Sequence, residues 1–499
     1  MRKGAGGWLV NMLLRGVLVV PVDRAAPDGP VDVRVAGDRV VEVARHLAPA
    51  PGEESLDCGG RWLIPGLWDA HVHLGQWARQ GSRPSLAGSA GRDDALSRVA
   101  RAGGTGLLVG GGYRPATWAE PPTVAALDEV TGDRPVVLVS GDAHAGWLNS
   151  AALRRFGLAE RDDPMTESEW FAALPAVLAA EDAQVGPGAY TAALSAAARL
   201  GVVGVCDFEF EPGFANWPGR YEVVGVPLRV RTSTYPVDLP AAVAAGLRTG
   251  AVLDPVHPLL TMGALKIISD GSLNTRTAHC CEPYSGGDHG VQNLPPAELS
   301  DLLGRARRAG LEVALHAIGD AAASLAVAAF AHTGASGSIE HAQLIRQAEI
   351  DEMAALGLVA SVQPAHLLDD RAVSAAIWGE ERSARSFPLR ALRDAGVRLA
   401  MGSDAPVAPL DPWLAMAAAV HRGRPGDQPW HPEHALTAGE ALASSTGGLG
   451  TVRAGQLADL AVLDADPLPG GESADVARRL RGMQVATTIV AGRVVHDTR

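Results

Sequence analysis

Residues 63 to 73, LIPGLWDAHVH, lead an apolar run into two histidines, His71 and His73. Residues two apart on a β-strand project from the same face, so both imidazoles can reach one metal ion without help from a helix or loop. Imidazole nitrogens are common ligands of zinc and similar divalent ions. The stretch therefore predicts a buried strand that carries the first part of a metal site.

Further apolar runs alternate with Ala- and Leu-rich helical patterns through the middle of the chain, which is typical of a parallel sheet wound with helices. With the opening stretch, the predicted strands are residues 67–73, 203–207, 228–234, 264–269, 311–316, 339–343, 358–363 and 397–402. Eight such units predict a (β/α)8 barrel of the TIM type, in the α/β class. The interval 74–200 is too long for one crossover, so we expect an inserted segment over the barrel mouth after strand one.

Short β-branched runs separated by turn residues occur near the two ends of the chain. They lie between residues 13 and 43, and again at 458–466 and 487–497. Because an isolated hairpin is marginal in water, we expect both ends to pair into one small β-sandwich domain. The predicted division assigns residues 1–65 and 452–499 to that domain and 66–451 to the barrel.

Composition excludes several classes of protein. The chain has 43 basic and 56 acidic residues, a net charge of -13, and lacks a Lys/Arg cluster, so nucleic acid is not an expected partner. It also lacks a long uncharged apolar run that could cross a bilayer, so a membrane is not an expected partner either. The 4 cysteines show neither CxxC spacing nor a disulfide framework, which suits the cytoplasm. We expect a cytoplasmic protein with a small-molecule substrate, and a homo-oligomer stays open.

Catalytic side chains of such barrels lie at the carboxyl ends of the strands. The strand ends carry a set of ligand-type residues: His71, His73, Lys266, His316, His341 and Asp404. A lone histidine after a strand is more often an ordinary hydrogen-bonded residue than a ligand, but this many at the strand ends of one barrel favour a metal centre. Lys266 has an alternative interpretation, an ion pair with a nearby carboxylate such as Asp270.

Eight motifs occur in order along nearly the whole chain: PGLWDAHVH (65–73), SGDAHAGWLNSAAL (140–153), LKIISDGSLNTRTA (265–278), LHAIGDAAA (315–323), IEHAQL (339–344), SVQPAH (361–366), MGSDAP (401–406) and GQLADLAVLDADP (455–467). Through them the sequence resembles the amidohydrolase superfamily, specifically its amidohydrolase-3 branch related to N-substituted formamide deformylases. The resemblance implies one or two divalent metal ions, zinc by default. Its implied ligands are His71, His73, His316, His341, Asp404 and a bridging, N-carboxylated Lys266.

The resemblance also implies hydrolysis of a C–N bond of the amide type, other than a peptide bond, in a small molecule. A cationic lysine cannot bind a metal, so Lys266 fits only as an anionic carbamate formed with carbon dioxide. Two metal ions sharing it would lower the pKa of a bridging water and polarise the substrate carbonyl. The bridging hydroxide would attack that carbonyl, while Asp404 accepts the proton and passes it to the leaving amine.

Two alternatives remain. A mononuclear deaminase on the same barrel would need a proton-shuttling glutamate close after His316, where the chain has Ala317-Ile318-Gly319. A non-catalytic regulatory relative would be expected to have lost ligands, and the implied set is complete. The presence of Lys266 also argues against the deaminase.

Four residues in the motifs expected at the barrel mouth are candidate substrate contacts: His144, Trp147, Gln363 and His366. Asp320 precedes an Ala-rich helical pattern and is predicted to be its N-cap. Between Leu158 and Gly201 the chain lacks a longer segment that such relatives usually carry beside the pocket, so substrate preference stays open.

Overall fold

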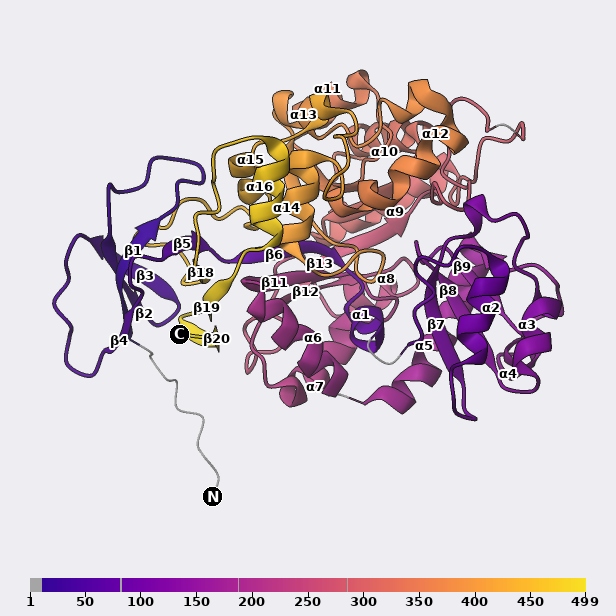
Figure 1. The fold of residues 1–499 in the computed structure, drawn as a ribbon, viewed down its shortest axis with the longest axis horizontal. Coiled ribbons are helices and arrows are strands. Elements are labelled where there is room, and N and C mark those ends of the chain that lie inside the picture. The colour runs from indigo at the N-terminus through magenta and orange to yellow at the C-terminus, as the bar shows by residue number, and fades with distance from the viewer. Residues whose placement is uncertain (1–10, 81–82, 187, 285) are drawn as a thin grey trace.

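The computed structural model describes residues 11–80, 83–186, 188–284 and 286–499. Figure 1 shows three parts side by side: a β-domain, a central barrel with its helices, and an inserted segment on the far side of the barrel from β1–β4.

The central sheet contains eight parallel strands that follow one another in chain order, which confirms the predicted barrel. They are β6 (Leu67–Val72), β11 (Val202–Asp207), β12 (Arg229–Thr234), β13 (Leu260–Ile268), β14 (Val313–Ala317), β15 (Gly337–His341), β16 (Val359–Val362) and β17 (Arg398–Met401). The first and last strands meet where Val72 forms a parallel bridge with Ala405, just after β17. All eight predicted runs therefore lie in the barrel wall.

Helices cover the outside of the barrel: α6 (Gly188–Arg199), α7 (Gly213–Val224), α8 (Leu239–Ala244), α9 (Pro296–Ala309), α10 (Asp320–Thr333), α11 (Gln347–Leu356), α12 (Leu367–Ser383), α13 (Leu389–Asp394), α14 (Pro412–His421) and α15 (Ala438–Ser444). The apolar faces of all of these helices except α12 pack against the strands in one core. In α9, for example, the buried residues Leu299, Leu302, Leu303 and Ala306 follow helical spacing. Two single-turn 3-10 helices, η2 (Pro364–His366) and η3 (Pro432–His434), lie among the later connections.

The predicted N-cap at Asp320 is wrong. Gly319 is the N-cap of α10, and Asp320 is the first residue of the helix. A Cβ atom at Gly319 would lie 2.1 Å from the carbonyl oxygen of His279, so the cap position accepts only glycine. The Asp320 carboxylate instead accepts a hydrogen bond of 2.8 Å from the backbone N–H of Cys281.

Both ends of the chain pair into one eight-stranded sheet, which confirms the expectation that the two ends pair with each other. Its strands are β1 (Asn11–Val19), β2 (Val31–Ala36), β3 (Arg39–Ala44), β4 (Glu54–Asp57), β5 (Trp62–Pro65), β18 (Leu460–Leu463), β19 (Val485–Val490) and β20 (Arg493–Asp497). β5 pairs antiparallel with β18, which joins the two ends of the chain. Leu14, Val33 and Ile489 are buried in a core that both halves of the sheet share. Helix α16 (Ser473–Arg481) connects β18 to β19 and packs against α14.

The inserted segment has a four-stranded sheet of its own, in the order β10-β9-β8-β7. Its elements are α2 (Arg92–Ala100), β7 (Leu108–Tyr113), η1 (Pro115–Thr117), α3 (Val124–Thr131), β8 (Val136–Ser140), β9 (Ala145–Leu148), α4 (Ser150–Arg155), β10 (Met165–Thr166) and α5 (Glu167–Val185). Two separate apolar cores stabilise it. The flanking helices α1 (Leu74–Gln80) and α6 contact each other, and α6 packs in the barrel core.

Candidate metal centre and substrate pocket

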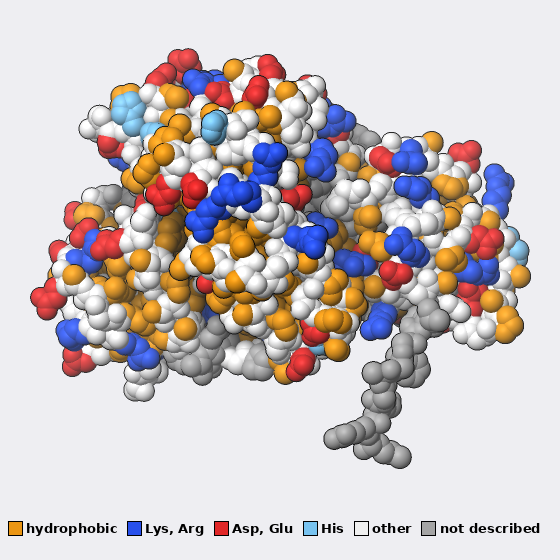
Figure 2. Space-filling model, turned by 180° about the vertical axis from the view of Figure 1, so that it is seen from behind, with side chains coloured by type: hydrophobic (Ala, Val, Ile, Leu, Met, Phe, Trp, Pro, Cys, Tyr) orange, Lys and Arg blue, Asp and Glu red, His pale blue; other side chains and the backbone are white. Residues whose placement is uncertain are grey.

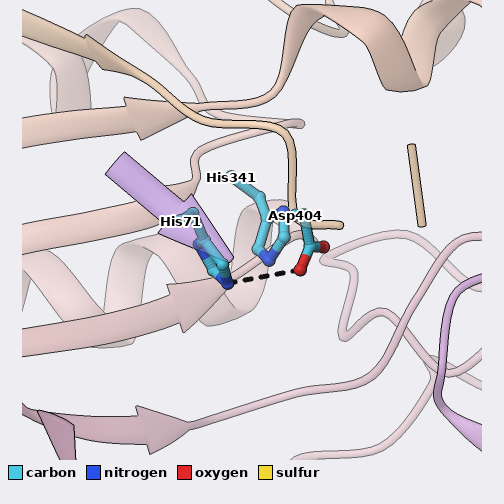
Figure 3. A group of neighbouring side chains, drawn as sticks. All are labelled: His71, His341 and Asp404. Atoms are coloured by element: carbon cyan, nitrogen blue, oxygen red, sulfur yellow. Dashed lines mark ion pairs between the residues drawn. The ribbon is translucent and has the colours of Figure 1, made fainter. Parts of the chain in front are cut away.

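Three predicted ligands converge at the carboxyl end of the barrel. Figure 3 shows His71, His341 and Asp404 pointing toward one another, and one ligand atom from each lies within 4.8 Å of the others. Nε2 of His71 and Nε2 of His73 each lie 3.4 Å from Oδ1 of Asp404. Two donor atoms around a tetrahedral ion at about 2.1 Å would lie about 3.4 Å apart. The spacing of these side chains therefore fits a divalent metal ion.

His316 lies beside His71, His341 and Asp404 but is not one of the three residues whose ligand atoms lie within 4.8 Å of one another. Its ring centroid is 4.5 Å from that of His341, while its Nε2 lies 3.4 Å from Oδ1 of Asp270. Burial lowers the pKa of His71, His316 and His341. Their imidazoles are therefore neutral at neutral pH, the form that coordinates a metal ion.

Lys266 is the buried amine of the site. It is 1% exposed, and Nζ has no hydrogen-bond partner among the described residues, with the Phe208 ring centroid 4.7 Å away. Burial lowers the pKa of Lys266 against the opposing influence of Glu340 and Asp404. Asp270 is instead engaged by the backbone N–H groups of Ile318 and Gly319. The alternative pairing of Lys266 with Asp270 is therefore absent, and the partnerless amine suits conversion into a ligand.

Glu340 belongs to the site, although the sequence interpretation did not single it out. Its Oε2 lies 2.7 Å from Nδ1 of His71, and Ser338 donates to its other oxygen. Burial favours protonation, but His71, Lys266 and Ser338 together outweigh it and lower the pKa of Glu340. A carboxylate that holds Nδ1 fixes the ring, so Nε2 of His71 faces Asp404. The signal in the sequence is a charged residue in a predicted barrel strand, directly before His341.

The backbone at two of the converging residues is strained. His341 has φ 70° and Asp404 has φ 56°, a region that residues other than glycine seldom occupy. The N–H of Asp404 donates to the carbonyl of His71 at 2.7 Å, which ties the segment after β17 to β6. Such strain persists where surrounding contacts hold it, and it is typical of functional sites.

Asp404 is the charged centre of the group. Burial favours its protonation, but the imidazoles of His71, His73 and His341 hold the pKa of Asp404 well below its ordinary value. Oδ2 also lies 3.8 Å from Nε2 of His366. One carboxylate thus faces both the metal-ligand group and the pocket.

A pocket opens above these side chains, between the barrel and the inserted segment. It is lined by Arg114, Asp142, His144, Ser272, Leu273, Asn274, Ile318, His341, Gln343, His366, Asp370, Asp404 and Val407. His144 and His366, two predicted substrate contacts, are among them. Nδ1 of His144 lies 3.1 Å from Oε2 of Glu167. Burial opposes the charge on His144, but Glu167 and Asp142 outweigh it and raise the pKa of His144 to about 9.

The other two predicted substrate contacts lie elsewhere. Trp147 is fully buried in a core of the inserted segment, where its ring packs edge-on against Tyr113 and its indole N–H donates to the carbonyl of Thr123. Gln363 lies beside His71, with Nε2 3.4 Å from Nδ1 of that histidine. Neither residue lines the pocket.

The inserted segment is anchored to the barrel beside the pocket. The hydroxyl of Ser272 donates to Oδ2 of Asp142, and that of Thr277 donates to Oε1 of Glu167, both at 2.5 Å. Ser272 and Thr277 belong to the chain that follows β13, whereas both carboxylates belong to the inserted segment. The pocket wall is therefore built from two parts of the chain that are bonded together.

The sequence model of the amidohydrolase family matches residues 54–496, which include every residue of the metal centre. The chain belongs to the amidohydrolase family. This amidohydrolase is 27% identical to the putative amidohydrolase YtcJ of Bacillus subtilis (strain 168), over 99% of this chain and 98% of that one. It is also 27% identical to the N-substituted formamide deformylase of Arthrobacter pascens, over 92% of this chain and 94% of that one.

A solved structure has the same architecture. The crystal structure of an uncharacterized metal-dependent hydrolase from Pyrococcus furiosus covers 92% of this amidohydrolase and 100% of its own chain, with TM-score 0.72 and 25% identity. Family, fold and ligand geometry agree on a metal-dependent hydrolase, and they confirm the family that the sequence motifs indicated.

Proposed function

We propose that this amidohydrolase cleaves a C–N bond of the amide type, other than a peptide bond, in a small molecule. The observation that carries the proposal is the convergence of His71, His341 and Asp404 at the floor of a pocket with polar walls. The similarity to a protein named for deformylation of N-substituted formamides supports the same bond type.

The proposed roles of the residues in the reaction are as follows. A divalent ion, zinc by default, held by the histidines and Asp404 would supply a Lewis acid and lower the pKa of water. Asp404 accepts a proton from the attacking water, since its carboxylate borders both the ligand group and the pocket. Asp404 then passes that proton to the leaving amine. His366, whose Nε2 lies 3.8 Å from Oδ2 of Asp404, lines the pocket and is proposed to contact the substrate.

Lys266 is proposed to become N-carboxylated and to hold a second ion. Its buried Nζ without a described partner supports this role, because a neutral amine can add carbon dioxide whereas an ammonium cannot. Addition of 13C-labelled bicarbonate should give a carbamate carbon signal that Lys266→Ala lacks. If both proteins give the same spectrum and bind the same amount of zinc, the role of Lys266 as a ligand is wrong.

A screen of N-formyl, N-acyl and cyclic amides on the zinc-loaded enzyme tests the activity. Release of the amine by wild type and its loss in Asp404→Asn would support the proposal. Release of ammonia from an aminated ring, without amide cleavage, would instead support the deaminase alternative. Turnover of neither group of compounds by zinc-replete protein would reject both.

Partners and location are also proposals. A small molecule is the proposed substrate, with neither nucleic acid nor a membrane as partner, and a homo-oligomer is open to test by light scattering. On the face shown in Figure 2, basic and acidic side chains both occur among hydrophobic ones. In the described parts of the chain, no helix has the length and apolar character needed to cross a bilayer. The proposed cytoplasmic location is supported by four cysteines that are all free thiols.

A further inference from the structure

One side chain of the pocket has hydrogen-bonding groups that nothing in the described chain satisfies. Asn274 is 5% exposed, lines the pocket together with His341 and Asp404, and has no described partner for either Nδ2 or Oδ1. A buried carboxamide without partners is costly, and native proteins rarely retain one without a reason. The position of Asn274 makes a ligand the natural partner.

The turn that carries Asn274 is held in place. The N–H of Arg276 donates to the carbonyl of Leu273, and the N–H of Thr277 donates to the carbonyl of Ser272, both at 3.0 Å. The Ser272 hydroxyl is fixed in turn by Asp142. Asn274 therefore lies on a turn whose backbone is already fixed, which lowers the entropic cost of binding a ligand.

Several other polar groups of the pocket already have partners within the described chain. Arg114 pairs with Asp369 at 3.2 Å, and the amide of Gln343 donates to Asp370 at 3.0 Å. Asp142, Asp370 and Asp404 place carboxylates on the pocket wall. A neutral group with a donor beside an acceptor would match the carboxamide of Asn274, whereas a carboxylate on the substrate has no donor to offer to Oδ1.

We infer that Asn274 is a specificity-determining residue that binds a carboxamide or ureido group on the substrate, one N–H to Oδ1 and one C=O to Nδ2. This inference rests on the proposed function, because it adds a second polar group to the amide that the metal centre cleaves. A site built to bond both groups rejects an analogue that lacks them more strongly than a purely apolar pocket would.

Three ketones test the inference without depending on cleavage of the scissile amide. Levulinamide carries a carboxamide, isoamyl methyl ketone carries an isopropyl group of similar shape in its place, and levulinate carries a carboxylate. Each is titrated calorimetrically into the zinc-loaded full-length chain. We expect wild type to bind levulinamide at least about tenfold more tightly than either of the others.

Asn274→Leu, which keeps the approximate size of the side chain, should reduce that ratio to about one. Asn216→Leu serves as the control, because Asn216 is an exposed residue of α7 that does not line the pocket. An equal affinity of wild type for the three ketones, or no detectable binding of levulinamide, would overturn the inference, as would an unchanged ratio in Asn274→Leu.

Thermal unfolding separates recognition from a structural role. Replacing a partnerless buried carboxamide by leucine should leave Tm unchanged or raise it, whereas loss of a structural hydrogen bond would lower it. A lowered Tm with an unchanged affinity ratio would assign Asn274 to the fold alone. A retained preference for levulinamide without cleavage of any amide would overturn the proposed function and support this inference.

Discussion

Nδ1 of His71 and Oε2 of Glu340 lie 2.7 Å apart, although 269 positions separate the two residues in the chain. Both side chains are 1% exposed, so bulk water cannot replace either partner. The bond links the first barrel strand to the sixth and orients the His71 ring toward Asp404. The strength of metal binding should therefore depend on a residue that is not itself a ligand.

Glu340→Gln is expected to weaken zinc binding by about 10–100-fold, because the amide keeps the shape of the side chain but loses the charge that orients His71. Competition with a chromogenic chelator measures the affinity. Glu42→Gln, at an exposed position of β3, is the control. An affinity equal to that of wild type would show that Glu340 has no effect on the ligand.

Metal removal is expected to lower Tm, because an ion that binds only the folded chain stabilises it. The gain is about 2.7 kcal/mol when free zinc is at 100 times Kd. Scanning calorimetry in zinc and in chelator measures the shift. Asp404→Asn should give a much smaller shift, because the carboxylate faces two imidazoles at 3.4 Å. Identical Tm values of wild type in both buffers would argue against a metal site.

Lys266→Met replaces a buried amine by an apolar chain of similar length. In chelator, the variant should be as stable as wild type or more stable, because the amine has no partner among the described side chains. In zinc, its stabilisation should be smaller than that of wild type. Urea unfolding in both buffers gives the comparison. A large loss of stability in chelator would indicate that the amine is already paired in the metal-free protein.

Acid stability should depend on Glu440, which caps α15 and pairs with Arg390 of α13. The hydrogen bond from Arg390 lowers the pKa of Glu440 from 4.5 to about 2. Because the folded pKa lies below the unfolded one, the contribution is complete above pH 4.5 and falls toward pH 2. Partial exposure limits it to about 1 kcal/mol.

Glu440→Gln should therefore lower the free energy of unfolding at neutral pH, and the difference from wild type should shrink as the pH falls below 4.5. Urea unfolding at several pH values measures the difference. The exposed Glu129→Gln of α3 is the control. A difference that stays constant with pH would mean that the ionised carboxylate is not the source of the stability.

Gly66, at the junction of the terminal sheet and the barrel, should tolerate no side chain. A Cβ there would lie 2.1 Å from Cγ1 of Val203, so Gly66→Ala is expected to cost about 1–3 kcal/mol. Adding Val203→Ala should recover part of that loss, which a double-mutant cycle by urea unfolding measures. Gly219→Ala, where a Cβ meets open space, is the control. Strict additivity of the two substitutions would rule out the clash.

The barrel was largely predictable because parallel strands buried on both faces are encoded as continuous apolar runs. Convergence of His71, His341 and Asp404 follows from the rule that strand ends of a barrel meet at one face. The pocket was less predictable. All four residues of β9 are buried, so alternation could not show whether Trp147 faces the pocket or the core. Asn274 lies in a turn, where no period indicates the direction of a side chain.

The hydroxyl bonds of Ser272 and Thr277 to the inserted segment have an evolutionary consequence. The proposed reaction depends on residues at the ends of the barrel strands. The shape of the pocket above them depends on a turn and an insertion that are hydrogen-bonded to each other. Sequence changes in the turn and the insertion can therefore accumulate without disturbing the ligands below. Descendants of such a chain can acquire new substrates by changes at the contact between the turn and the insertion, while the metal-ligand residues stay the same.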